Sequence, residues 1–276
     1  MLDRYFQKQV HLAGIDANFI CPDDCDAPGC WMEDIIVEVT LFDLIRLSPD
    51  LDIPVSGFFD DICRIGLQTC ETNPRYMRLL IKLNKPCCFF KDKRCRVQRS
   101  KPLNCILFPE YHQIAGLLPE LAGRPVYINF PCLKHEVDIS DPRKQALKKL
   151  REMSRKEEAL SCYFLFGTPS FILDAKPMTR QLKKEKPKKK FFLMPEYDKL
   201  LGLMLEPIGF LDTVMRKVSG LDTEEGIARL FEKLEDNELM GSLVEQMSNP
   251  ETVHIIKSGK IKQAKRNLQR PDIIFM

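Results

Sequence analysis

The chain has 276 residues, of which 44% are hydrophobic and 29% are charged, and its formal net charge is only +3. This composition is ordinary for a globular protein, and its eleven cysteines are too few for a small disulfide scaffold. No stretch approaches the roughly 18 apolar residues that a membrane-spanning helix needs. Residues 1–20 contain no uninterrupted apolar core of signal-peptide length. We therefore expect a cytoplasmic protein that has no membrane partner.

The first half of the chain predicts short strands separated by loops. Residues 21–30, CPDDCDAPGC, predict a loop, and residues 33–39 predict a strand that leads directly into a helix from residue 41. Thr40 and Asp43 have the spacing of a capping box, which marks the start of that helix. Mixed loop and short helix follow over residues 49–65. Two more strands are expected, over 77–83 and 126–130.

The character of the sequence changes at residue 140. Asp141 and Pro142 predict an N-cap and a first helical residue, and the helix continues through residues 143–164. Residues 176–190 carry eight Lys or Arg and one carboxylate, so we expect an exposed basic linker there. Two amphipathic helices are then predicted, over 195–220 and 222–249. A shorter basic segment, residues 253–270, follows them.

The cysteines form two groups and a late single residue. They are Cys21, Cys25 and Cys30, then Cys87, Cys88, Cys95 and Cys105, and finally Cys132. Because thiols stay reduced in the cytoplasm, grouped cysteines there indicate metal binding or catalysis more often than disulfides. Metal sites need thiolates that converge from segments brought together by the fold. The basic side chains between residues 85 and 99 either offset the charge of such thiolates or form a solvated surface.

The expected fold class is therefore α+β. We predict a small cysteine-rich metal-binding domain with short strands and helices over residues 1–138. A mostly helical C-terminal part over residues 139–276, including the basic linker, follows it. Ten of the eleven cysteines lie before residue 138, which indicates that the thiols belong to one site rather than to general core packing.

Several spaced motifs resemble those of a known family. Residues 37–47, VEVTLFDLIRL, match its strand-to-helix segment, and residues 87–90, CCFF, look like its Cys-x-Phe-Leu. Residues 95–98, CRVQ, look like its Cys-x-Ile-Tyr, and 101–109, KPLNCILFP, look like its Arg-Pro-x-x-Cys-Arg-x-Phe-Pro. Cys132 stands where a late cysteine is expected. In these features the chain resembles the YkgJ-type cysteine-cluster family, which is described as a zinc- or iron-chelating domain.

The resemblance extends over residues 20–132 and implies a set of metal ligands. These are Cys21, Cys25, Cys30, Cys87, Cys95, Cys105 and Cys132. The chain departs from the family at Trp31, which stands where a fourth cysteine of the first group is typical, and at Gln98, Lys101 and Ile106. Seven cysteines are one short of two four-cysteine sites. Cys88, a water or a carboxylate can supply the eighth ligand, or one site has no fourth protein ligand.

The ligand spacing favours an iron–sulfur cluster over zinc. Closed zinc sites prefer cysteines two to four residues apart, and Cys21 and Cys25 fit this rule whereas Cys95 and Cys105 do not. Iron–sulfur clusters accept wider and more irregular spacing because the cluster is larger than one ion. His112 and His135 are reserve ligands. Three further cysteines, Cys63, Cys70 and Cys162, have apolar or helical contexts that indicate a structural role.

Two other functions stay open. A flagellin lysine N-methylase carries a similar cysteine domain, which suggests a metal-dependent protein-lysine methylase, although the chain has no glycine-rich S-adenosylmethionine loop. The second is a nucleic-acid- or partner-binding module with a structural zinc, in which the C-terminal helices bind a protein. The basic run 183–190 lacks aromatic residues before Phe191, so we favour a solvated linker over a nucleic-acid patch. The sequence does not decide whether the protein is an enzyme.

Overall fold

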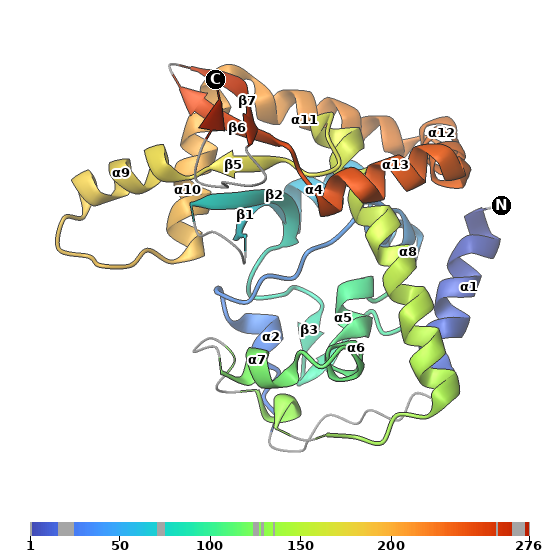
Figure 1. The fold of residues 1–276 in the computed structure, drawn as a ribbon. Coiled ribbons are helices and arrows are strands. Elements are labelled where there is room, and N and C mark those ends of the chain that lie inside the picture. The colour runs from blue at the N-terminus through green and yellow to red at the C-terminus, as the bar shows by residue number, and fades with distance from the viewer. Residues whose placement is uncertain are drawn as a thin grey trace.

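The computed structural model describes residues 2–15, 25–70, 75–123, 127, 130–134, 136–257, 259–266 and 274–275. Six of its strands form one sheet with the order β1-β2-β5-β6-β7-β8. They are β1 (Cys63–Thr69), β2 (Tyr76–Leu83), β5 (Ile172–Asp174), β6 (Thr252–Lys257), β7 (Lys260–Arg266) and β8 (Ile274–Phe275). Helices surround this sheet (Figure 1), so the α+β class is confirmed.

The sheet joins segments from both halves of the chain. Strand β2 pairs antiparallel with β1 and also with β5, where Arg78 lies opposite Ile172. Strand β5 is parallel to β6, and the remaining pairs are antiparallel. The sheet therefore crosses residue 138. The predicted basic segment 253–270 supplies β6 and β7, whereas β2 confirms the strand expected over 77–83.

Helix α3 (Leu41–Leu51) begins where the sequence predicts. The Thr40 hydroxyl accepts a hydrogen bond from the backbone of Asp43, and the Asp43 carboxylate accepts one from the backbone N–H of Thr40. The strand expected before it is reduced to an isolated bridge between Glu38 and Lys82. Around this bridge, Val39 N–H donates to the Ile81 carbonyl at 3.0 Å. A capping box thus ends the strand within a few residues and starts the helix.

Helix α8 (Asp141–Phe166) is the long helix expected after residue 140. Its N-cap is Ser140 and not Asp141, because the Ser140 hydroxyl accepts the hydrogen bond from the Arg143 backbone. The buried Arg143 side chain pairs with Glu110 and donates to the Ala13 carbonyl at 2.7 Å. This contact joins α8 to α6 (Glu110–Ile114) and α1 (Leu2–Gly14). Figure 1 shows α8 running from the sheet to the small helices below it.

The C-terminal half differs from its prediction in three places. Residues 176–185 are not a linker but helix α9 (Lys176–Glu185), because Met178 and Leu182 are buried on one of its faces. The helix predicted over 195–220 is divided by Gly209, whose φ of 64° ends the regular turn. The helix predicted over 222–249 is divided by Asp236, whose carboxylate caps the next helix.

The divided helices and the linking turns have the following bounds. They are α10 (Met194–Leu205), the 3₁₀ turn η3 (Glu206–Ile208), α11 (Phe210–Ser219), the turn η4 (Gly220–Asp222), α12 (Glu224–Glu235) and α13 (Asn237–Ser248). Thr223 caps α12 by accepting a hydrogen bond from Gly226 N–H at 3.2 Å. Within the described ranges, no helix is both long and apolar enough to cross a bilayer.

The remaining elements are short and include most of the cysteine segments. They are α2 (Pro28–Trp31), α4 (Val55–Asp61), β3 (Phe90–Lys91), β4 (Arg94–Cys95), α5 (Leu103–Leu107), α7 (Leu118–Ala122) and η2 (Pro131–Leu133). In Figure 1, α2, β3, α5, α6 and α7 gather away from the sheet, at the lower end of α8. Of the strand predicted over 126–130, only Tyr127 and Phe130 are described. Phe130 N–H donates to the Tyr127 carbonyl at 3.0 Å, which is a turn.

Candidate metal centre

Ten of the eleven cysteines lie in the described part of the chain, and all ten are free thiols. Cys21, a predicted ligand, lies outside it, as does the reserve ligand His135. Three separate segments carry Cys30, Cys87, Cys95 and Cys105, and hydrogen bonds of the backbone and of side chains hold these segments in place. The four residues are half-buried.

Cys30 and Cys87 are joined directly through the backbone. Cys87 N–H donates to the carbonyl of Cys30 at 2.7 Å. The ammonium group of Lys85 donates to the carbonyl of Gly29 in the same short helix, α2. The segments of the first and second cysteine groups are therefore in contact, although Gly29 and Lys85 are 56 residues apart in the sequence.

A tight hairpin returns the chain from Cys87 to Cys95. Asp92 and Lys93 form its turn, with φ values of 52° and 59°, and Phe90 lies opposite Cys95 across the β3–β4 pair. Two left-handed central residues are typical of the turns that fit a two-residue hairpin. Phe90 N–H also donates to the carbonyl of Cys87 at 3.0 Å, which places both cysteines at the open end of the hairpin.

The segment that carries Cys105 is held by side chains of residues 38–46. Asp43 accepts a hydrogen bond from Leu103 N–H at 3.0 Å, and Arg46 donates to the Lys101 carbonyl at 2.5 Å. Asn104 donates to the carbonyl of Glu38 at 3.0 Å. The capping box that the sequence predicts thus has a second role, since its carboxylate also fixes the first turn of α5.

The charges of neighbouring thiols act on Cys30 and on Cys105. Burial and, to a smaller extent, the charges of Cys87 and Cys95 raise the pKa of Cys30 to about 11, against the opposing charges of Lys85 and Lys101. Burial raises the pKa of Cys105 to about 12, with Cys30 and Cys87 among the charges that contribute. These basic residues can offset several neighbouring thiolates, as a metal-binding cluster of cysteines requires.

Two other predicted ligands, Cys25 and Cys132, lie in the described part of the chain. Cys25 is half-buried before α2, and Cys132 is buried in η2 among Phe130, Leu133 and Ile35. In the described part of the chain, no three His, Cys, Asp or Glu side chains stand close enough to hold one metal ion.

Cys63 and Cys88 adjoin the same thiols, although the sequence predicts only a structural role for Cys63. Burial raises the pKa of Cys63, and the charges of Cys88 and Cys87 raise it further. Cys63 also belongs to the hydrophobic cluster against which Cys87 and Cys95 pack. The sequence carries no signal for this, because Cys63 begins strand β1 and is remote from every motif.

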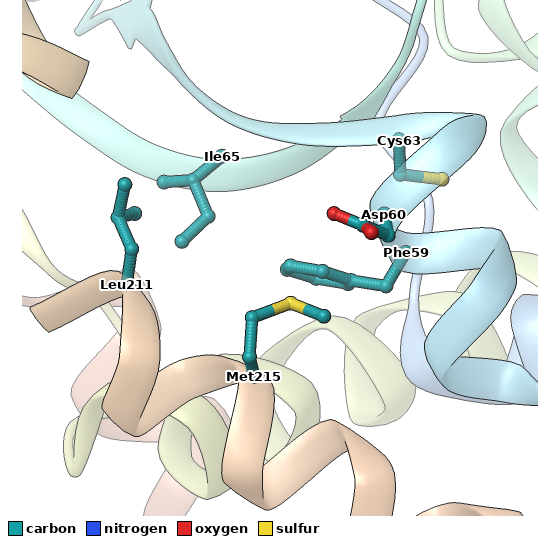
Figure 2. A pocket seen from close by; sticks show the side chains of 6 residues that line it. All are labelled: Phe59, Asp60, Cys63, Ile65, Leu211 and Met215. Atoms are coloured by element: carbon teal, nitrogen blue, oxygen red, sulfur yellow. The ribbon is translucent and has the colours of Figure 1, made fainter. Parts of the chain in front are cut away.

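A small pocket of about 170 Å³ lies beside Cys63. It is formed by Phe59, Asp60 and Ile65 on one side and by Leu211 and Met215 of α11 on the other. Figure 2 shows the Asp60 carboxylate directed into this apolar space and the sulfur of Cys63 directed away from it. Cys63 also lines the pocket, but its sulfur points away from the apolar space, so the Asp60 carboxylate is the polar group directed into it.

No family model matches the chain. No curated protein and no solved structure matches it either. The resemblance to the YkgJ-type family consequently rests on the motifs of residues 20–132 alone.

Proposed function

We propose that the chain is a metal-binding protein whose centre includes Cys30, Cys87, Cys95 and Cys105. The observation that supports this is that three segments bring four free thiols close enough for their charges to interact, together with two lysines that offset these charges. Cys21, Cys25 and Cys132 complete the ligand set that the family resemblance implies. The residues present fit such a group, because soft thiolates are the ligands that zinc and iron–sulfur clusters share.

Within this proposal we favour an iron–sulfur cluster. Thiolate ligands of a single zinc ion must meet at one point, whereas a cluster of irons and sulfides is larger and accepts more widely spaced sulfurs. The nine residues between Cys95 and Cys105 suit the wider spacing that clusters accept rather than the short spacing of closed zinc sites. A bound cluster would supply electron transfer or a rigid cross-link between the three segments.

The test is the metal and sulfide content of the protein purified without oxygen. We expect iron, acid-labile sulfide and a broad visible–near-ultraviolet absorption. Serine replacement of Cys95 and Cys105 should remove all three signals, whereas Cys162→Ala in α8, a control at a buried thiol outside the centre, should retain them. A colourless protein that contains stoichiometric zinc would show that the centre binds zinc and not an iron–sulfur cluster. Failure to bind either metal after reconstitution would reject the proposal.

The same variants separate a functional metal from a structural one. If Cys95→Ser and Cys105→Ser lose the metal and keep the circular dichroism spectrum, the metal acts in function. If the fold is lost with the metal, the centre is structural, as in many small zinc modules.

A further inference from the structure

Helix α9 is a fixed part of the molecule, although its sequence predicts a solvated linker. Met178 and Leu182 are buried and pack with Leu200 and Leu201 of α10. The hydroxyl of Thr179 lies 3.0 Å from that of Tyr197. One face of α9 is therefore anchored to the protein, and the opposite face is held outward. Figure 1 shows α9 projecting from the body of the fold.

The outward face of α9 carries a row of cations. Lys176, Arg180, Lys183 and Lys184 are exposed, and their spacing of four, seven and eight residues places them on one side of the helix. The row is about 12 Å long at 1.5 Å per residue. Within the described ranges, these side chains form no ion pair. A rigid row of unpaired cations is a site for a partner with repeated negative charges.

The segment after α9 adds further cations and an aromatic ring. Glu196 pairs with Lys186 at 2.6 Å and with Lys189 at 2.8 Å, and it also accepts the backbone N–H of Leu193. These contacts hold the segment in place, and the chain leaves the side chain of Phe191 82% exposed. The neighbouring Phe192 packs against the core instead. The ring of Phe191 is thus presented to solvent directly after Lys188 and Lys190.

We propose that this surface binds single-stranded nucleic acid. The basic ridge, as we call it, comprises Lys176, Arg180, Lys183, Lys184, Lys188, Lys190 and Phe191. Single-stranded binding sites combine a row of cations along the phosphate backbone with an aromatic ring on which a base stacks. The ridge has both parts. This proposal is independent of the metal centre.

The anchoring of α9 argues against an anionic membrane as the partner. A helix that lies in a membrane surface inserts its apolar face. In α9 this face is already occupied, since Met178 and Leu182 are buried in the protein. Only Phe191 and Leu193 would remain to insert, whereas one exposed ring is sufficient to stack on a base.

The test is the fluorescence anisotropy of a labelled oligothymidylate of about 15 nucleotides, titrated with the full chain at several salt concentrations. We expect log K to fall with log salt with a slope of up to about −4, for at most six phosphate contacts. The double variant Lys183→Glu and Lys184→Glu should weaken binding at least 10-fold and reduce the magnitude of the slope by about 1.4. Phe191→Ala should weaken binding roughly 5- to 100-fold and leave the slope unchanged.

The matched control is Lys148→Glu with Lys149→Glu, which makes the same charge change at exposed positions of α8. It should leave the affinity within about twofold of the parent protein, because distant exposed charges are screened. Several outcomes would overturn the proposal. They are no binding at 50 mM salt, equal loss in the control, equal affinity for duplex DNA with no effect of Phe191→Ala, or competition by phosphatidylserine vesicles or polyglutamate at equal charge.

Discussion

The side chain of Lys82 passes directly over Gly66 to reach the carboxylate of Asp198. A Cβ on residue 66 would overlap the Cε atom of Lys82 and lie 2.8 Å from its Cδ atom. The ion pair is buried, with 3% of the Lys82 side chain and 6% of the Asp198 side chain exposed. Asp198 also accepts a hydrogen bond from Leu67 N–H at 2.8 Å. Because Gly66 in β1 has no side chain, Lys82 of β2 can reach across β1 and form its ion pair with Asp198 of α10.

Gly66→Ala should therefore destabilise the protein by roughly 3 kcal/mol, because displacing Lys82 would break its buried ion pair and leave Asp198 with the longer 3.5 Å contact to Arg64. The measurement is urea-induced unfolding. Gly202→Ala in α10 is the control, since its Cβ meets nothing within 4 Å and alanine favours a helix. The two variants should shift the unfolding midpoint in opposite directions. Equal midpoints would refute the steric role of Gly66.

Gly226 in the first turn of α12 gives a second steric prediction. A Cβ there would overlap the carbonyl oxygen of Gly220 and lie 2.8 Å from its carbonyl carbon, and backbone atoms cannot move aside as a side chain can. Gly226→Ala should cost about 2 kcal/mol, although helix propensity alone predicts a gain of up to about 1 kcal/mol. Gly241→Ala in α13, which has open space, should show that gain. Thermal unfolding of both variants measures whether each substitution lowers or raises the stability of the protein.

Glu157 predicts how stability depends on pH. Burial, together with the nearby charge of Asp43, raises the pKa of Glu157 to about 8. The unfolded value is about 4.3. Between these two values the folded chain holds a proton that the unfolded chain has released. Stability therefore falls as pH rises from about 4.3 to 8, by at most about 1.4 kcal/mol per pH unit from this group.

Glu157→Gln should remove that dependence and keep the fold. The Glu157 carboxylate contacts Tyr5, Gln9 and Thr40. A neutral amide can accept from the first two and donate to the hydroxyl of Thr40. The measurement is the free energy of unfolding at several pH values between 5 and 8. A parent protein and a variant with parallel profiles would contradict the assignment to Glu157.

Asp43 predicts a link between the core and the candidate metal centre. Its carboxylate is 1% exposed, pairs with Arg46 at 2.9 Å and accepts the N–H of Leu103, two residues before Cys105. Asp43→Ala should cost about 3 kcal/mol, because Arg46 would lose its buried partner. If the metal proposal holds, the variant should also release its metal to a chelator at least several-fold faster.

A matched variant separates these two effects. Glu110→Ala breaks the buried ion pair with Arg143, whose distance is 2.5 Å, and it lies outside the contacts to residues 101–104. It should lower stability by a similar amount without faster metal release. Equal acceleration in both variants would show that Asp43 acts only through global stability.

Local signals in the sequence were sufficient for some elements. The Thr40–Asp43 capping box, the buried strand over residues 77–83 and the helix after Ser140 all appear as expected. Each of these depends on neighbours along the chain. The linker predicted over 176–190 was wrong for 176–185, because only two residues, Met178 and Leu182, anchor that helix among many cations. These two side chains stabilise the helix only by packing against α10, and the local sequence pattern gives no information about that contact.

Of the predicted ligands, the fold brings Cys30, Cys87, Cys95 and Cys105 near one another. The sequence determined which residues can ligate a metal, that they lie in the first half of the chain, and where α3 begins, because these follow from residue type and from local hydrogen bonding. Tertiary structure decided that Cys63 adjoins Cys87 and Cys88, that Gly66 makes room for Lys82, and that α9 presents its cations outward. These relationships join residues remote in sequence, and they depend on the volume and charge available after packing.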